Sequence, residues 1–395
     1  MLNPFKSVIL EKLGVKSWIN AANWTTTSGG SYLEQPVIEA MNEASSTFVD
    51  MYELLDKACD KVAELCKVDS AFITSGAGAG MALSTAACMT GKDFAKMLKL
   101  PNTEEMKNEV IIQSGEVPPY WQQYQMTGAK LRRVGLPFPK NPDSRYIEAA
   151  INDNTACIAC VYSRNSSPRG SVPIIDCIQI AKKYDIPIQI DAAAVLPPVA
   201  NLHKFSDMGA DLTIFSGGKG IRGPNDTGLI LGSGTRGKEL IEAIRMQACP
   251  NTGFGRAFKV SKEQIVGLVT ALELFVKKDE KLEYKKQMAR LEKIKNFLSH
   301  LNNIDLEIVP NDEKYHEFPV MAHVPRLKLE WNEHKIGMKA EDLDLKLATK
   351  YPPIMLGSTI LNPFTNKQIR YINPYLLRDN EVEIIAKRII EIFSH

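Results

Sequence analysis

The chain has 395 residues, which is long for a single hydrophobic core and typical of two domains. Hydrophobic residues make up 44% of it and charged residues 24%, the composition of a globular protein rather than a disordered one. The 48 Lys and Arg nearly balance the 46 Asp and Glu, so the chain lacks the basic field that favours nucleic acid. No apolar run has the pattern of a secretion signal or a membrane helix, and the scattered cysteines favour reduced thiols in the cytoplasm.

The first two thirds of the chain alternate between strand and helix patterns. Residues 41–66 have helical spacing, and the apolar run 71–73 precedes a glycine-rich turn at 74–80 and a helix of small residues. Further elements are strands at 110–112, 130–134, 156–162, 187–190, 212–215 and 228–231, and a helix at 176–184. This alternation predicts an α/β fold with a large, doubly wound, mostly parallel sheet.

The pattern changes after residue 258. Residues 261–301 read as one long amphipathic helix, in which Ser261 and Gln264 form a capping box. Strands at 306–309, 319–324 and 367–372 and a final helix at 380–393 follow. We therefore predict an N-terminal segment at 1–45 that packs with the small domain, a large domain at 46–258 and a small α+β domain at 259–395.

The glycine turn after Ile73 is the first candidate binding element. Small residues at the start of a helix allow backbone N–H groups to converge on an anion, although a tight-packing turn would need the same residues. Met81 stands where the dinucleotide-binding fingerprint requires glycine, so a dinucleotide-binding site of that type is excluded.

Lys219 lies in a glycine-rich segment that follows a predicted buried strand. A nucleotide phosphate loop is excluded, because Thr213 and Gly220 stand where it requires glycine and a hydroxyl residue. The alternative is a solvated surface lysine, but the flanking glycines favour the close approach of a bulky planar ligand. A lysine in such a site has a lowered pKa and can form a Schiff base with an aldehyde.

Asp191 ends another predicted strand and could cap the next segment. A carboxylate at this place could equally pair with a pyridinium nitrogen, as a pyridoxal phosphate site requires. Ligands of such sheets bind at the carboxyl ends of the strands. The anion turn, the carboxylate and Lys219 follow three different strands, and together they predict a pyridoxal phosphate site.

The stretches 74–80, 191–198 and 216–224 resemble the selenocysteine-synthase-like family of pyridoxal phosphate enzymes. Within that family the branch of the D-glucosaminate-6-phosphate ammonia-lyases is the most similar, and the likeness spans nearly the whole chain. It implies a fold-type-I enzyme that forms a homodimer or a larger homo-oligomer, with the active site between subunits.

The resemblance also implies a role for each site residue. Lys219 would hold the cofactor covalently, Asp191 would hold the pyridinium proton, and the phosphate would bind at Ser75, Gly76, Ala77 and Ser216. Related ammonia-lyases have a histidine beside the ring in the loop after the third strand. This chain has none there, which leaves Glu116, Tyr120 or another residue as the group beside the ring. The substrate candidates are Arg222, Arg256, Arg370 and Tyr120, and Arg169 could line the mouth of the site. For Arg370, a surface salt bridge is an equal alternative to binding a substrate carboxylate.

These inferences predict a lyase that removes the α-proton of a small amino acid or 2-amino sugar acid through Lys219 and eliminates a β-substituent. The products would be a 2-keto acid and ammonia, and the substrate could carry a phosphate. Alternatives that keep the cofactor are β-replacement, racemisation, transamination, tRNA-linked selenium transfer and non-catalytic binding. We expect no metal site, because Cys157 and Cys160 point to opposite faces of a predicted strand.

Overall fold

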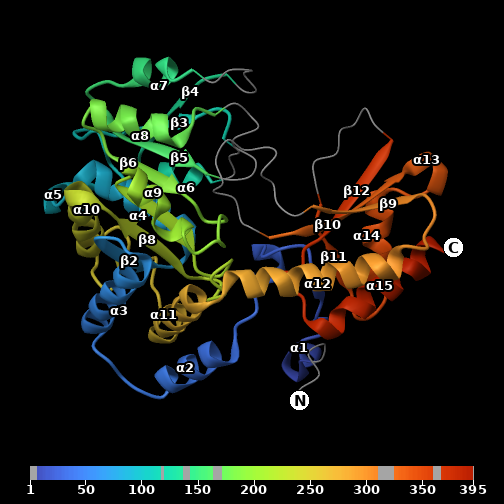
Figure 1. Cartoon of the computed structure of the whole chain (residues 1–395). Coiled ribbons are helices and arrows are strands. Elements are labelled where there is room, and N and C mark those ends of the chain that lie inside the picture. Colours follow the sequence, from blue (N-terminus) through green and yellow to red (C-terminus); the bar gives the residue numbers. More distant parts are fainter. Residues whose placement is uncertain are drawn as a thin grey trace. The chain divides into compact units, whose positions relative to one another are not determined.

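The computed structural model describes residues 7–116, 120–136, 143–162, 171–309, 324–358 and 366–394. Their contacts divide the chain into two compact units (Figure 1). The large unit contains the described residues between 30 and 277, and the small unit contains 7–29 and the described residues from 278 onward. Within these residues no helix is both long and apolar enough to cross a bilayer.

The large unit is built on a seven-stranded sheet with the order β2-β8-β7-β6-β5-β3-β4. All pairs from β4 to β7 are parallel, and β8 is antiparallel to both of its neighbours. The strands are β2 (Ser70–Thr74), β3 (Glu109–Gln113), β4 (Lys130–Val134), β5 (Thr155–Val161), β6 (Ile188–Asp191), β7 (Leu212–Ser216) and β8 (Gly228–Gly232). The predicted mostly parallel α/β fold is confirmed.

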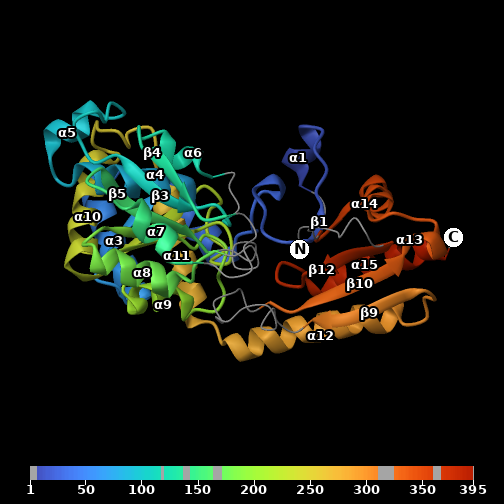
Figure 2. The same ribbon diagram turned by 90° about the horizontal axis from the view of Figure 1, so that it is seen from above.

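Helices cover both faces of this sheet. The helix α4 packs against one face of β5, and α8 packs against the other; in Figure 2, α8 and α9 lie on the lower side of the strands. The helices are α2 (Gln35–Ser45), α3 (Met51–Cys66), α4 (Gly76–Thr90), α5 (Phe94–Lys99), α6 (Gln122–Gln125), α7 (Arg145–Ala150), α8 (Ile174–Lys183), α9 (Asn201–Met208), α10 (Gly234–Gln247) and α11 (Lys262–Lys277). Every residue of β5 is buried, as expected for a strand between two helical layers.

The two cysteines of β5 point to opposite faces of the sheet. Cys157 contacts Cys88 of α4, whereas Cys160 contacts Cys177 of α8. Alternation along the strand sends two residues an odd number of positions apart to opposite sides. All seven cysteines of the chain are free, and these two belong to the core rather than to one site.

The small unit combines an antiparallel sheet of order β12-β10-β9 with a short parallel pair, β1 and β11. Its hydrophobic core gathers Leu291, Trp331 and Ile385 with other buried apolar residues. The elements are α1 (Val8–Lys12), β1 (Ile19–Ala21), a 3-10 turn (Thr26–Ser28), α12 (Glu280–Leu298), β9 (Ile304–Val309), β10 (Arg326–Asn332), α13 (Glu333–Ile336), α14 (Ala340–Thr349), β11 (Ile354–Leu356), β12 (Lys367–Ile372) and α15 (Asp379–Phe393).

The expected single helix at 261–301 is wrong, because the structure has two helices there, α11 and α12. Asp279 starts the second helix, since its carboxylate accepts hydrogen bonds from the backbone N–H groups of Lys281 at 3.0 Å and Leu282 at 3.1 Å. The helix α11 packs against α2 and α3 in the large unit. The contact division therefore falls after residues 29 and 277, not at the domain boundaries expected after 45 and 258.

The remaining small-unit expectations divide between confirmed and undescribed elements. The strands at 306–309 and 367–372 correspond to β9 and β12, and the final helix corresponds to α15. Most of the strand expected at 319–324 lies outside the described residues.

Candidate active site at the carboxyl ends of the strands

The register of the large sheet brings the candidate residues to one edge. Thr74, the first residue of the glycine turn, pairs with Gly228 of β8, and Gly228 pairs in turn with Ser216 of β7. One strand further, Asp191 pairs with Ile214 of β7. The ends of β2, β7 and β6 therefore meet at the same edge of the sheet, as we expected for a site of this kind.

The glycine turn forms the start of α4. Ser75 is the N-cap residue, and its side chain makes no capping hydrogen bond, so the first N–H groups of the helix keep their hydrogen-bonding capacity. A Cβ on Gly228 would lie 2.5 Å from the carbonyl carbon of Gly76 and 2.8 Å from the nitrogen of Ala77. The start of β8 thus abuts this turn, and the helix end is suited to a phosphate.

Asp191 is buried at the end of β6, with 6% of its surface exposed. Burial raises the pKa of its carboxyl group, while a hydrogen bond from the Ala193 nitrogen at 2.9 Å and the charge of Lys219 lower it. The backbone bond orients the carboxylate, and the nearby cation favours its ionised form.

Lys219 follows β7, and most of its side chain is shielded from solvent. Burial lowers the pKa of its amine, and the negative charge of Asp191 opposes that shift. Because each group shifts the pKa of the other, the two lie within electrostatic reach of one another. A lysine with a lowered pKa holds a larger fraction of neutral amine, the form that attacks an aldehyde or accepts a proton.

The glycines beside Lys219 have a different explanation from the one expected. A Cβ on Gly218 would lie 2.3 Å from the Cα of Asn225, and one on Gly220 would lie 2.4 Å from the carbonyl oxygen of Leu196. The close approach is therefore made by the chain itself rather than required by a ligand. The contact at Leu196 also packs the segment after Asp191 directly against the lysine loop.

Glu116 is fully enclosed at this edge, with 2% of its surface exposed. It accepts hydrogen bonds from Gln113 Nε2 at 3.0 Å and from the backbone nitrogen of Val161 at 2.9 Å. Burial raises the pKa of its carboxyl group to about 8, and the charge of Asp191 adds to the rise. A carboxyl group fixed between β3 and β5 is not free to stack on a ring, whereas Tyr120 is 52% exposed.

Sequence reasoning missed Tyr124 of α6 altogether. Its hydroxyl group is buried and has no hydrogen-bond partner among the described residues. Burial raises the pKa of this phenol, and the charges of Asp191 and Glu116 add to the rise. No local signal could have found it, because α6 has only four residues and the relevant neighbours come from distant strands.

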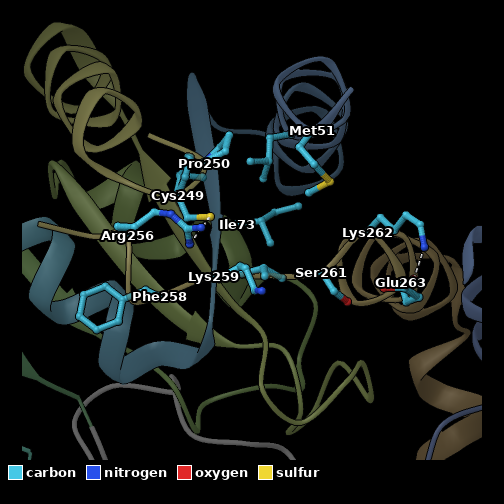
Figure 3. A pocket seen from close by; sticks show the side chains of 13 residues that line it. Met51, Ile73, Cys249, Pro250, Arg256, Phe258, Lys259, Ser261, Lys262 and Glu263 are labelled. Atoms are coloured by element: carbon cyan, nitrogen blue, oxygen red, sulfur yellow. Dashed lines mark hydrogen bonds and ion pairs between the residues drawn. The ribbon is translucent and has the colours of Figure 1, made fainter. Parts of the chain in front are cut away.

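Arg222 and Arg256 occupy different surroundings in the large unit. The guanidinium of Arg222 pairs with Glu34 at 3.2 Å. Arg256 lines a pocket of about 340 Å³ beside the edge strand β2, together with Lys259 and residues of α3. Figure 3 shows Arg256 reaching toward Cys249, whose sulfur lies 3.7 Å from Nη1. Ser75, Asp191 and Lys219 are not among the residues lining this pocket.

Arg370 belongs to the small unit and is 3% exposed. Its Nε lies 3.0 Å from both carboxylate oxygens of Asp344, and its Nη2 lies 2.7 Å from one of them and 3.6 Å from Glu341. These pairs occupy the face of the guanidinium that a substrate carboxylate would need. Arg169 lies outside the described residues.

Comparison with known proteins identifies the family of the chain. Residues 26–321 match the aminotransferase class-V family. The chain belongs to that family. It is therefore a fold-type-I enzyme, and its cofactor is pyridoxal phosphate.

Individual relatives differ in their reactions. The chain is 28% identical over 392 residues to D-glucosaminate-6-phosphate ammonia lyase of Salmonella typhimurium (strain 14028s / SGSC 2262), with 98% of each chain covered. It is 30% identical over 308 residues to the 5'-C-glycyluridine monooxygenase-decarboxylase of a Streptomyces species, covering 76% of this chain and 74% of the relative. A solved structure of D-glucosaminate-6-phosphate ammonia-lyase superposes with a TM-score of 0.80 at 26% identity and 99% coverage of both chains.

Proposed function

We propose that the enzyme is an ammonia-lyase that eliminates a β-hydroxyl group from a phosphorylated 2-amino sugar acid. The observation that carries this proposal is the strand register, which brings Asp191, the loop of Lys219 and an uncapped helix start to one edge of the sheet. Full-length similarity to D-glucosaminate-6-phosphate ammonia lyase supports the substrate class. We also propose that the chain is related to the selenocysteine-synthase-like enzymes, which its motifs resemble.

The residues at the sheet edge fit pyridoxal phosphate. The N–H groups at Ser75, Gly76 and Ala77 and the hydroxyl group of Ser216 would hold its phosphate, and the buried Thr74 hydroxyl, which has no partner among the described residues, lies beside them. When bound, the cofactor supplies an electron sink for the carbanion that forms when the α-proton leaves.

The chain's own groups would then move the protons. The Asp191 carboxylate holds a proton on the ring nitrogen, for which its backbone bond to Ala193 orients it. The Lys219 amine accepts the α-proton as the Cα–H bond breaks, and burial favours the neutral form needed for this step. That proton then leaves with the β-hydroxyl group as water. Hydrolysis of the released enamine gives the 2-keto acid and ammonia.

We infer further that two copies of the chain assemble in the cytoplasm. Phe48 is 104% exposed, Val49 45% and Tyr52 55%, and they adjoin Met51 of the pocket that contains Arg256. Covering this apolar patch with a second copy would remove it from water. The seven free cysteines suit a reducing compartment. Light scattering should give twice the chain mass, and Phe48→Asp should reduce it to one chain.

The decisive experiment incubates the purified protein with pyridoxal phosphate and then with D-glucosaminate-6-phosphate or its unphosphorylated form. We expect a visible absorbance band that borohydride bleaches, and ammonia and 2-keto acid in equal amounts from the phosphorylated substrate. Lys219→Ala should lose both the band and the activity, because no other amine replaces it, whereas Lys57→Ala on the exposed face of α3 should keep both. A protein that stays colourless would end the proposal.

The Streptomyces relative favours a second candidate reaction. Its name denotes decarboxylation with oxygen, so the same site could release the α-carboxylate instead of the α-proton. Oxygen uptake with CO₂ release would identify this route, whereas ammonia release without oxygen uptake would identify elimination. The same substrate screen separates racemisation, transamination and β-replacement by their products, and salt-sensitive tRNA retention would indicate selenium transfer.

A further inference from the structure

Residues 30–34 pack against the loop that contains Lys219. The backbone nitrogen and the hydroxyl group of Ser31 both donate to the carbonyl oxygen of Gly218, at 3.1 Å and 2.9 Å. A Cβ on Gly30 would lie 2.9 Å from the same oxygen, so the two backbones are in direct contact. The peptide unit immediately before Lys219 is therefore fixed by a segment almost 190 residues away in the sequence.

Arg222 makes a second connection between the same two segments. Its backbone nitrogen donates to the carbonyl oxygen of Lys219 at 3.0 Å. Its guanidinium carbon lies 4.1 Å from the centre of the Tyr32 ring, and its Nη1 lies 3.2 Å from Glu34 Oε1. The side chain is only 11% exposed. A cation shielded in this way gains more from a ring and a carboxylate than it would at the surface.

Two features of Arg222 are costly for a residue with a purely structural role. It has a φ of +64°, in the left-handed region that is strained for a residue with a side chain and open to glycine. Its Nε is buried and has no hydrogen-bond partner within the described part of the chain. Strain and unmet hydrogen bonds of this kind concentrate at functional sites, where the surrounding structure holds them in place.

We propose that Arg222 is a positioning residue which, with Tyr32 and Glu34, fixes the Lys219 loop against residues 30–34. This inference rests on the proposed function, in which the Lys219 amine must attach the cofactor and later accept the α-proton. Both tasks require the amine to return to one place while the side chain moves, and small displacements of a reacting group cost large factors in rate. A backbone held on both sides of Lys219, at Gly218 and at Arg222, meets this requirement.

The test compares Arg222→Lys and Arg222→Gly with the matched control Arg236→Lys, which alters an arginine paired with Asp185 and Asp211 on another part of the same unit. Lysine keeps the charge but loses the planar contact with Tyr32. Glycine removes the side chain and relieves the left-handed strain, so this variant keeps its fold. Thermal unfolding of the cofactor-free protein checks that each variant is folded.

Two rates are measured. One is the appearance of the visible band when pyridoxal phosphate is added, and the other is the labelling of Lys219 in cofactor-free protein by a small aldehyde with borohydride, read by peptide mass spectrometry. We expect both Arg222 variants to slow attachment about tenfold and to change the labelling rate, with Arg236→Lys at the wild-type rates. If Lys219 is labelled at the wild-type rate in folded Arg222 variants, the positioning role is overturned. A wild-type protein that never binds the cofactor would instead overturn the proposed function, because the labelling experiment does not depend on it.

Discussion

Both units bury ionisable side chains, but they compensate the buried charge differently. In the small unit, the guanidinium of Arg370 faces Asp344 and Glu341 at 2.7 Å and 3.6 Å. At the carboxyl edge of the large sheet, Asp191 has a cation within electrostatic reach, and Glu116 is held by neutral donors. Burial shifts the pKa values of both carboxyl groups upward.

The two kinds of compensation suit different roles, one in the fold and the other in the reaction. A matched ion pair contributes to the position of its own strands and resists the approach of a substrate. A buried charge with incomplete compensation has a shifted pKa and remains able to bind a further group, which is typical of functional sites. From this comparison we propose that Arg370 serves the fold of the small unit and that the Asp191 edge serves the reaction.

Asp191→Asn should give the largest effect. An amide of nearly the same shape cannot hold a proton on the ring nitrogen, so we expect kcat/KM for ammonia release to fall about a thousandfold. The stability of the cofactor-free protein should stay equal or rise, since a buried charge is removed. Steady-state kinetics and thermal unfolding measure the two. Retained activity in a stable variant would contradict the assignment of this edge to the reaction.

Glu116→Gln should change the pH dependence of stability. The folded pKa of Glu116 is about 8, above its ordinary value of 4.5, so the folded state keeps a proton that the unfolded chain releases. This stabilisation is complete below pH 4.5 and is lost as the pH rises through 8, a loss of about 3–4 kcal/mol between pH 5 and pH 8. Glutamine cannot titrate.

The measurement is the free energy of unfolding of cofactor-free protein in denaturant at several pH values. Wild type should lose stability relative to Glu116→Gln as the pH rises. The control Glu53→Gln, exposed on α3, should follow the wild-type curve. Parallel curves for Glu116→Gln and wild type would mean that Glu116 is already ionised at low pH.

Arg370→Gln should have the smallest effect and one confined to stability. It leaves Asp344 without its main partner, but that carboxylate is 43% exposed, so we expect a loss of about 1–2 kcal/mol. Asp344→Asn in the same chain should recover part of it. The rate of cofactor attachment at Lys219 should stay unchanged, and a loss of substrate affinity larger than the loss of stability would instead support the expected carboxylate-binding role.

The sequence alone determined the parts of this protein that depend on local pattern. Strand periodicity, the glycine turn at 74–80 and the residues that follow each strand predicted the parallel sheet and placed Asp191 and Lys219 at the same edge of it. These succeed because a parallel sheet places the carboxyl ends of its strands together, whichever helices connect them. The family resemblance likewise rests on contiguous motifs.

The compensation of the buried charges depends on the tertiary structure. From the sequence, Arg222 is expected near Lys219 and Arg370 in the small domain. The sequence does not show that Arg222 pairs with Glu34 or that Arg370 pairs with Asp344. It names Glu116 as a candidate beside the ring but gives no sign of Tyr124, the other buried titratable group near Asp191. Burial and Coulomb energy depend on which distant segments become neighbours, and residue patterns of a few turns or strands do not specify those neighbours.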